Sequence, residues 1–427
     1  MRRLIAWVAR FAAALLFHRV EVAGKERYPT DRPVLLVANH FNGFVDPVLI
    51  TSAMRRTPRF IAKAGLQGLP VAGWLLRRAG VVFVRRQVDG GGAAENQSAF
   101  HECHQALVER DVVAIFPEGT THDRPRMDPI KTGAARIALG ARAAGATRLA
   151  IVPVGLTFPD KVALRSTALV QFGPPIELDV VSPDAVDDTD TAAVRELTEV
   201  IDRGLRDVSL DLPDVETALA LEQAALVALS SPADPDPSLE DRYDLVRRLG
   251  RSGPEAQAAV RTVIGRYLTM LNGLRLTDRD VIAPTNPTRL LRSAIGIALL
   301  VIVLGGLVAA TAIVNVWPAG LVVLASLAVK TPVSKGTARV VVGLVSFPIA
   351  WIVAGVLTAD GALRVSLVVL TSAAGALAAV WLVERAMALA RMLLRWQAQR
   401  ERVGTVGQVL AVRSEVGDTV QDAVTGP

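Results

Sequence analysis

The feature that most constrains the fold is a run of 24 residues without a charge, from Ser293 to Val316. At about 1.5 Å of rise per residue, a helix of this length crosses a bilayer core of about 30 Å. Two further runs, from Val340 to Ala359 and from Val365 to Val383, are also about one membrane thick. The sequence therefore predicts a C-terminal transmembrane helix bundle.

A fourth apolar segment, Ala319 to Val329, has only 11 uncharged residues and is too short to span a bilayer by itself. Basic residues before, between and after the spans favour cytoplasmic connections, because positively charged loops stay inside. That orientation requires an even number of crossings, so we expect about four passes, with three passes and a re-entrant hairpin as the alternative. The basic residues are Arg289, Arg292, Lys330, Lys335, Arg339, Arg385, Arg391, Arg395 and Arg400.

The N-terminal residues 1–19 combine apolar side chains at helical spacing with several arginines. Leu4, Val8, Phe11 and Leu15 share one face of the expected helix, and Arg10 interrupts what would otherwise resemble a secretory signal. This pattern predicts an amphipathic helix lying in the membrane interface. The alternative is an ordinary amphipathic helix packed on the domain that follows.

Composition narrows the class of protein further. The chain has 51% hydrophobic residues, a net charge of +6 and a mean hydropathy of +0.37. Its one cysteine, Cys103, excludes an internal disulfide and a multi-cysteine zinc site. A cationic chain rich in apolar residues favours anionic lipid over nucleic acid as its partner.

Between residues 20 and 180, short apolar runs alternate with helical stretches. This alternation predicts an α/β domain with a mostly parallel sheet flanked by helices. A break rich in Asp, Ser and Thr then leads into helical patterns at about 192–208, 214–230, 238–249 and 255–274. The expected domains are 1–19, an interfacial helix; 20–180, the α/β domain; 181–285, a helical region of unknown role; 286–385, the transmembrane region; and 386–427, a basic and then polar cytoplasmic tail.

The expected strand Val34–Ala38 runs directly into Asn39 and His40, and Asp46 follows before Pro47. The carboxyl ends of strands are where sites of α/β proteins form. A histidine can accept a proton from a substrate hydroxyl while a carboxylate orients the ring and stabilises the imidazolium. Asp46 alone is equally typical of a helix N-cap, because Asp-Pro often opens a helix.

Together with three later motifs, this pair resembles the glycerolipid acyltransferases of the PlsC type, which transfer acyl chains to glycerol-phosphate hydroxyls. The four motifs occur in order and lie within roughly residues 20–180. They are Asn39-His40 with Asp46-Pro47, Gly80-Val-Val-Phe-Val-Arg-Arg86, Phe116-Pro-Glu-Gly-Thr120 and Ile151-Val-Pro-Val154. The resemblance implies that His40 is the catalytic base and that Asp46 orients it.

The same resemblance implies a set of substrate-binding residues. The phosphate of the acceptor needs cationic donors, and the family spacing selects Arg86, with Lys63 as a second candidate. The Pro-Glu-Gly-Thr motif offers a carboxylate for acceptor hydroxyls, a close backbone approach and a hydroxyl donor. The expected substrate-binding residues are Arg86, Lys63, Asn42, Glu118, Gly119 and Thr120. Lys131, near the start of a predicted helix, is a further cation close to this motif.

Two departures qualify the resemblance. Five residues, instead of the more common four, separate His40 from Asp46, and the extra residue puts their contact in question. With Asn42 and the apolar C-terminal half, this spacing resembles the branch of glycerol-3-phosphate and dihydroxyacetone-phosphate acyltransferases. Thr121 stands where many relatives have an arginine, which removes one possible phosphate contact.

No metal or cofactor is expected. His101 and His104 lie one helical turn apart, but two histidines without a third ligand make a weak metal site. His122 and Asp123 are interpreted as loop residues. The resemblance implies acyl-CoA or acyl carrier protein as the acyl donor, and glycerol 3-phosphate or 1-acylglycerol 3-phosphate as the acceptor.

The function implied by the resemblance is an O-acyltransferase of phospholipid synthesis, integral to the cytoplasmic membrane, with its catalytic domain facing the cytoplasm. The alternative is a lipid-moving or scaffolding membrane module whose acyltransferase-like domain is inactive. The three longer spans contain no ionisable residue, and such residues usually mark a transport pathway. This absence favours the enzyme.

Overall fold

The computed structural model describes residues 2–68, 70–85, 93–160, 165–283, 286–329, 332–401 and 406–426. By their internal contacts these residues form two units. The first unit contains residues 2–211 and 332–337, and the second contains residues 212–329 and 338–426. The boundary near Asp211 lies later than the expected end of the α/β domain at residue 180.

The first unit is built on a sheet of eight strands in the order β1-β7-β6-β2-β5-β3-β4, with β8 pairing β6. Five of the seven strand pairings are parallel, and only β6 with β7 and β6 with β8 are antiparallel. The mostly parallel sheet expected from the sequence is thus confirmed. The strands are β1 (Phe17–Ala23), β2 (Val34–Ala38), β3 (Arg59–Lys63), β4 (Val82–Val84), β5 (Val112–Ile115), β6 (Ala150–Thr157), β7 (Ser166–Phe172) and β8 (Ile176–Glu177).

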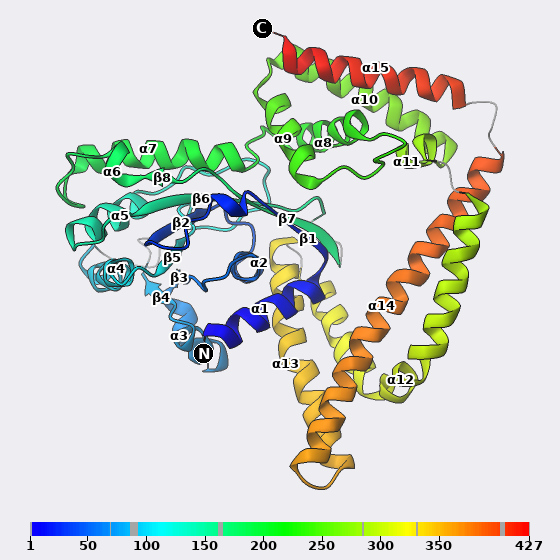
Figure 1. Cartoon of the computed structure of the whole chain (residues 1–427), viewed down its shortest axis with the longest axis horizontal. Coiled ribbons are helices and arrows are strands. Elements are labelled where there is room, and N and C mark those ends of the chain that lie inside the picture. The colour runs from blue at the N-terminus through cyan, green and yellow to red at the C-terminus, as the bar shows by residue number, and fades with distance from the viewer. Residues whose placement is uncertain are drawn as a thin grey trace. The chain divides into compact units, whose positions relative to one another are not determined.

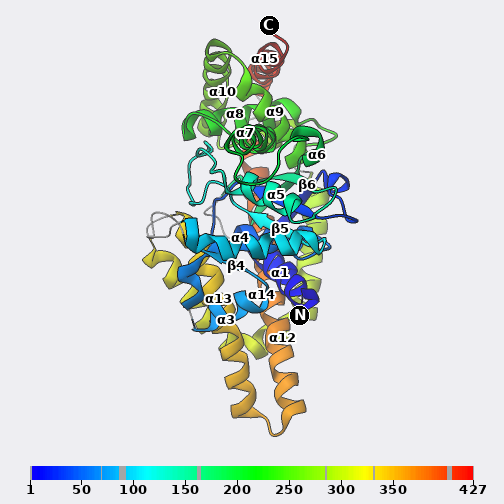
Figure 2. The ribbon, with the colours of Figure 1, turned by 90° about the vertical axis from the view of Figure 1, so that its left-hand side faces the viewer.

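Helices cover both faces of this sheet (Figure 1). On one face α4, α5 and α7 bury their apolar sides on β2, β5 and β6, and Figure 2 views the sheet from this side. The other face carries α2, against which α1 packs. The helices of this unit are α1 (Arg2–Leu16), α2 (Val45–Ala53), α3 (Pro70–Arg78), α4 (Ala93–Val108), α5 (Gly133–Ala143), α6 (Leu178–Val181) and α7 (Thr191–Val208), with short 3₁₀ turns at Lys25–Arg27 and Ala64–Gly68.

The later domain boundary has a simple physical reason. Helix α7 buries Val194, Leu197, Ile201 and Leu205, which recur every three or four residues and form one face. Leu197 and Ile201 join the same core as the strands β2 and β6. Helix α7 therefore completes the α/β unit instead of opening the helical region.

Helix α1 packs on its own domain through small side chains. Its alanines at positions 6, 9, 12 and 13 are buried, while Leu4, Trp7 and Val8 are exposed. Arg2 binds the carboxylate of Asp111, which directly precedes β5. The buried alanine face fits the alternative, an ordinary amphipathic helix packed on its domain. The exposed apolar face is the one predicted to lie in the membrane interface.

The second unit contains a bundle of helices that precedes and follows the membrane segment. Its helices are α8 (Val215–Leu229), α9 (Leu239–Arg251), α10 (Pro254–Leu274), α11 (Asp278–Ile282) and α15 (Val406–Thr425). Arg413 of α15 donates to Asp278 at 2.8 Å and to the backbone oxygens of Val227 and Ser230 at 2.7 Å. The segment expected as a tail therefore ends in a helix that closes this bundle.

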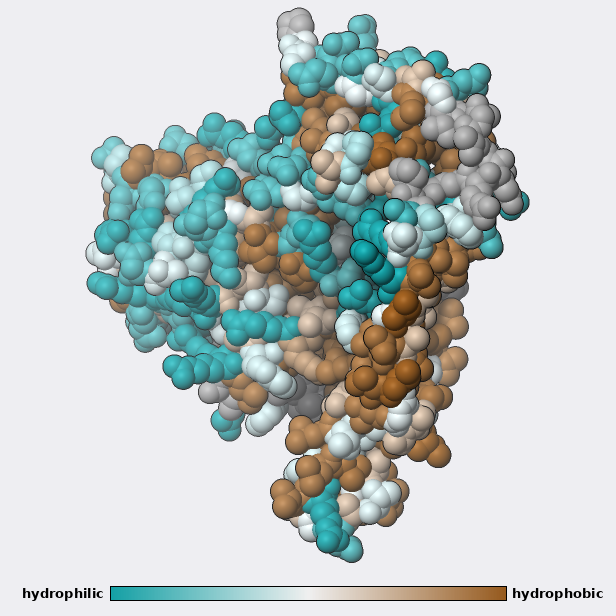
Figure 3. Space-filling view, turned by 45° about the vertical axis from the view of Figure 1, so that its right-hand side comes forward, coloured by the Kyte–Doolittle hydropathy of each residue, from teal (hydrophilic) through white to brown (hydrophobic). Residues whose placement is uncertain are grey.

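Three helices of the described chain are long and apolar enough to cross a membrane: α12 (Pro287–Ala328), α13 (Pro332–Thr358) from residue 338 onward, and α14 (Ala362–Glu401) up to residue 397. Figure 3 shows apolar surface over these helices. The weak segment 319–328 forms no helix of its own, because it continues α12 past Pro318. The ribbon of α12 bends sharply within its length (Figure 1), as expected of a helix with an internal proline. Lys330, one of the expected cytoplasmic cations, lies outside the described residues.

Polar but uncharged groups join the three membrane helices. Asn315 of α12 donates to the backbone oxygen of Ser372 in α14 at 3.0 Å and accepts a hydrogen bond from the Trp351 indole of α13 at 2.9 Å. Gly375 lets α14 approach α12, since a Cβ there would lie 1.9 Å from Oγ1 of Thr311. Interhelical hydrogen bonds and small residues are the usual means by which membrane helices associate.

Candidate active site

The predicted motifs meet at one edge of the sheet, because the parallel strands β2, β5, β3 and β4 all end there. Asn39, which follows β2, fixes this end of the strand. Its Nδ2 donates to the Leu156 oxygen at 3.0 Å, and its Oδ1 accepts from the Leu156 nitrogen at 2.7 Å. The next residue, His40, therefore starts from a rigid position.

His40 and Asp46 are in contact. Nδ1 of His40 lies 2.9 Å from Oδ2 of Asp46, whose side chain is fully buried, while the His40 side chain is 15% exposed. Because a carboxylate can only accept, Nδ1 donates and the neutral ring keeps Nε2 as its basic nitrogen. The ring stacks on Phe116 with 4.0 Å between centroids, which fixes its plane. This is the geometry that a histidine base with an orienting carboxylate requires.

The inserted residue between the pair does not separate them. Asp46 lies in the first turn of α2, and its Oδ2 accepts from the backbone nitrogens of Phe41 and Asn42, both at 2.7 Å. These bonds fold the loop back over the carboxylate. Asp46 is therefore not the N-cap of α2, since that position belongs to Phe44.

Asn42 stabilises the start of α2 from inside the same loop. Its side chain is buried, and Oδ1 accepts from the backbone nitrogens of Phe44 and Val45 at 3.1 and 3.2 Å. Asn42 thus shapes the loop that joins His40 to Asp46. Its predicted contact with substrate stays a prediction.

Glu118, which follows β5, holds the loop of His40 from the other side. Its Oε1 accepts from the His40 backbone nitrogen at 2.9 Å, and its Oε2 accepts from the backbone nitrogen of Asp128 at 2.9 Å. The side chain is fully buried. A hydroxyl of the acceptor would have to share this carboxylate with these donors, so the predicted substrate contact remains a prediction.

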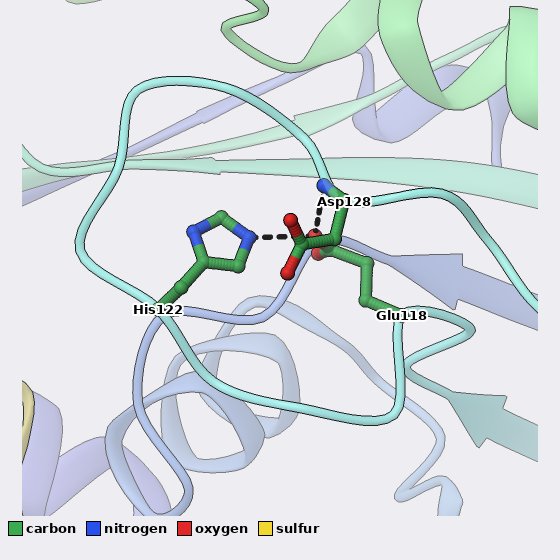
Figure 4. Close-up of side chains that lie close together, drawn as sticks. All are labelled: Glu118, His122 and Asp128. Carbon is green, nitrogen blue, oxygen red and sulfur yellow. Dashed lines mark hydrogen bonds and ion pairs between the residues drawn. The ribbon is translucent and has the colours of Figure 1, made fainter. Parts of the chain in front are cut away.

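The structure adds His122 to the site, where the sequence indicated only a loop residue. Its Nε2 lies 2.6 Å from Oε2 of Glu118 (Figure 4). The His122 ring also meets Phe41 edge to face. The spacing of four residues between Glu118 and His122 was the one signal in the sequence. Together with Phe41, this ring links the two loops that flank His40.

Glu118, His122 and Asp128 also place three possible metal-ligand atoms within 4.8 Å of one another. The carboxylate of Glu118 is nevertheless satisfied by protein donors, since it accepts from two backbone N–H groups and pairs with the His122 ring. A buried carboxylate with hydrogen-bond partners of this kind needs no cation. We therefore derive no metal chemistry from this cluster.

The pair of His122 and Glu118 makes a prediction about pH. The hydrogen bond that the His122 ring donates to Glu118 raises the pKa of His122 above its usual value of 6.5. The charged ring then contributes stability that is full below the unfolded pKa and is lost as pH rises through the higher folded pKa. Relative to His122→Gln, the wild-type chain should be more stable by about 1 kcal/mol at pH 5 to 6, and the difference should shrink above neutral pH.

Thermal unfolding of the full-length chain in detergent, recorded between pH 5 and pH 9, measures this difference. His101→Gln removes an exposed histidine of α4 and is the control, with no expected change in melting temperature. A difference between wild type and His122→Gln that stays constant over this pH range would contradict the assignment.

The remaining motif residues lie in the loop after Glu118. Gly119 has a φ of +71°, a conformation that favours glycine, and a Cβ there would lie 2.7 Å from Nζ of Lys131. Thr120 is exposed. The loop thus presents backbone, a hydroxyl and a lysine ammonium at the edge where His40 lies. Their contact with the acceptor stays a prediction.

The two cations predicted for the phosphate differ in what the structure describes. Lys63 ends β3 at the same edge of the sheet, is exposed, and pairs in register with Val84 of β4. Arg86 lies outside the described residues.

Comparisons with known proteins agree with the motifs. The family model described as Acyltransferase matches residues 19–157. The chain is similar to glycerol-3-phosphate O-acyltransferase 2 of Saccharomyces cerevisiae, with 36% identity over 30% of this chain and 18% of the yeast protein. It is also similar to lyso-ornithine lipid O-acyltransferase of Pseudomonas aeruginosa, with 34% identity over 36% of this chain and 52% of that protein.

A third relative is 1-acyl-sn-glycerol-3-phosphate acyltransferase alpha of Mus musculus, with 31% identity over 39% of this chain and 58% of the mouse protein. The chain thus spans between about one fifth and three fifths of the length of these relatives. Among solved structures, the 1-acyl-sn-glycerophosphate acyltransferase of Thermotoga maritima matches 48% of this chain and 78% of its own, with 22% identity and a TM-score of 0.37.

Proposed function

We propose that the chain is a membrane-bound O-acyltransferase of phospholipid synthesis, a proposal supported by the Acyltransferase family model that matches residues 19–157. It moves a fatty acyl group from acyl-CoA or acyl carrier protein to a hydroxyl of a glycerol phosphate. The observation that carries this proposal is the 2.9 Å contact between Nδ1 of His40 and the buried carboxylate of Asp46.

In the proposed reaction, Nε2 of His40 takes the proton of the acceptor hydroxyl as its oxygen attacks the thioester carbonyl. Asp46 stabilises the imidazolium that forms. The carbon–sulfur bond then breaks, and the departing thiolate takes the proton back from His40. Neither a metal nor a prosthetic group enters these steps, and the acyl donor is the only co-substrate. Base catalysis of this kind contributes a factor of roughly 10² to 10⁴.

The membrane helices anchor the proposed enzyme in the bilayer that receives its lipid product. Helix α15, which follows the last span, packs in one bundle with α10, which precedes the first. Two flanks of one bundle must lie on the same side of a membrane, which requires an even number of crossings. The internal proline of α12, Pro318, allows residues 319–328 to turn back as the expected short pass. By its basic flanks we assign this side to the cytoplasm.

The test is acyl transfer by the purified full-length chain in lipid vesicles. Radiolabelled acyl-CoA or acyl carrier protein is supplied with glycerol 3-phosphate, dihydroxyacetone phosphate or 1-acylglycerol 3-phosphate. Transfer to at least one glycerol phosphate is expected, and the preferred acceptor identifies the step in lipid synthesis. If the label stays on both donors with every acceptor, the proposal is wrong and the non-catalytic membrane module is favoured.

A further inference from the structure

The first turn of α13 contacts the loop that carries the proposed base. Residues 332–337 belong to the α/β unit by their backbone contacts, although more than 100 residues separate them from the rest of that unit in sequence. A Cβ added to Gly336 would lie 2.8 Å from Nδ2 of Asn42 and 3.7 Å from Cγ2 of Val45. The connection between two membrane helices therefore touches the segment between His40 and Asp46.

This contact lies against a loop that tolerates little displacement. The Asn42 amide is fixed by the two hydrogen bonds that it accepts from Phe44 and Val45, and its backbone nitrogen donates to Asp46. A side chain at position 336 would have to push this amide aside and break those bonds. Glycine at position 336 thus allows α13 to approach the loop closely.

The neighbour of Gly336 in the chain is a cation. Lys335 is half-buried and carries its ammonium on a flexible four-carbon stem. Consecutive Cα atoms lie 3.8 Å apart, so this stem starts beside the loop of Asn42. Of the two phosphate cations expected from the sequence, Lys63 is exposed and Arg86 lies outside the described residues. A cation at the start of α13, next to the residue that meets Asn42, is the kind of donor that an anionic acceptor needs.

We propose that Lys335 and Gly336, at the start of α13, form part of the acceptor site. In this site Lys335 binds the anionic headgroup of the substrate, and Gly336 lets the first turn of α13 pack against Asn42. This assignment rests on the proposed acyl transfer to a glycerol phosphate. It extends the substrate site to residues 335 and 336 of the first unit, which the motifs of residues 20–180 do not include.

The closing experiment compares Lys335→Gln with wild type in the full-length chain in vesicles. A hydrogen bond to a charged group typically contributes enough for the KM of the phosphorylated acceptor to rise by about 10- to 100-fold, with little change in kcat. Activity toward the neutral analogue without phosphate, glycerol or monoacylglycerol, should not change. Lys335→Arg keeps the charge and should retain most of the affinity, and Lys25→Gln, at the opposite edge of the sheet, is the matched control.

Gly336→Ala tests the packing of α13 against Asn42. We expect kcat to fall roughly tenfold, because the added methyl group displaces Asn42. Gly296→Ala, where the added methyl meets no atom within 4 Å, is its control. Equilibrium binding of labelled glycerol 3-phosphate or 1-acylglycerol 3-phosphate gives a readout that does not depend on turnover. If wild type binds the anion and Lys335→Gln binds it equally well, the inference is overturned. If wild type binds but transfers no acyl group, the proposed function fails, while weaker binding by Lys335→Gln still supports the inference.

Discussion

Replacing His40 with alanine is expected to lower kcat for acyl transfer by roughly 10²- to 10⁴-fold, because the acceptor hydroxyl loses its base. The KM for either substrate should change little, since the ring is assigned a role in the proton transfer and not in binding. The measurement is initial-rate kinetics of the purified full-length chain in vesicles with the acceptor identified for wild type.

A second variant separates chemistry from folding. His40→Asn keeps an amide nitrogen at the position of Nδ1 that can donate to Asp46, so the buried carboxylate retains its partner, but this side chain cannot take up a proton at neutral pH. It should be as inactive as His40→Ala and fold as wild type does. His18→Ala, at an exposed position of β1, is the control. If the activity of His40→Ala stays within a few fold of wild type, His40 is not the catalytic base.

The core of the fold follows from the sequence where strands are apolar on both sides. The strands β2, β5 and β6 are almost entirely buried and read as continuous apolar runs. The strands β1 and β3 escape this signal, because β1 exposes His18 and Arg19 and β3 begins and ends with a cation. Strands of that kind can be identified only from the structure, which shows the strands with which they pair.

The helices of the second unit follow the same rule. Apolar residues at helical spacing predicted α8, α9 and α10, which the structure confirms. Helix α15 lies in a mostly polar segment, and its buried residues Val409, Val416 and Val420 are spaced by seven and four positions. Three apolar residues at such wide spacing are too few to predict a buried helix from the sequence alone.

The candidate site, too, was predictable from the sequence only in part. The sequence placed His40, Asp46 and Glu118 near one edge of the sheet, because each follows the end of a strand or opens the next helix. It did not reveal that Glu118 supports the backbone of His40, nor that His122 pairs with Glu118. The contact of Gly336 with Asn42 had no sequence signal at all, because no periodic pattern relates two residues so far apart in the chain.

Replacing Asp46 with asparagine is expected to lower kcat by roughly 10²- to 10⁴-fold while leaving the fold intact. Oδ2 of Asp46 accepts from Nδ1 of His40 and from the backbone nitrogens of Phe41 and Asn42. Oδ1 is buried and has no hydrogen-bond partner in the described part of the chain. The asparagine oxygen can therefore take the place of Oδ2, with its NH₂ group where no donor now points, so the loop keeps its three hydrogen bonds.

What the variant loses is the negative charge that stabilises the imidazolium as His40 takes the proton. The loss should therefore appear in kcat and not in the KM of the acceptor. Asp31→Asn, on the loop before β2 at the other edge of the sheet, is the matched control and should keep full activity. If Asp46→Asn folds normally and works as fast as wild type, the contact between imidazole and carboxylate is structural only, and His40 would have to act as a base without an orienting partner.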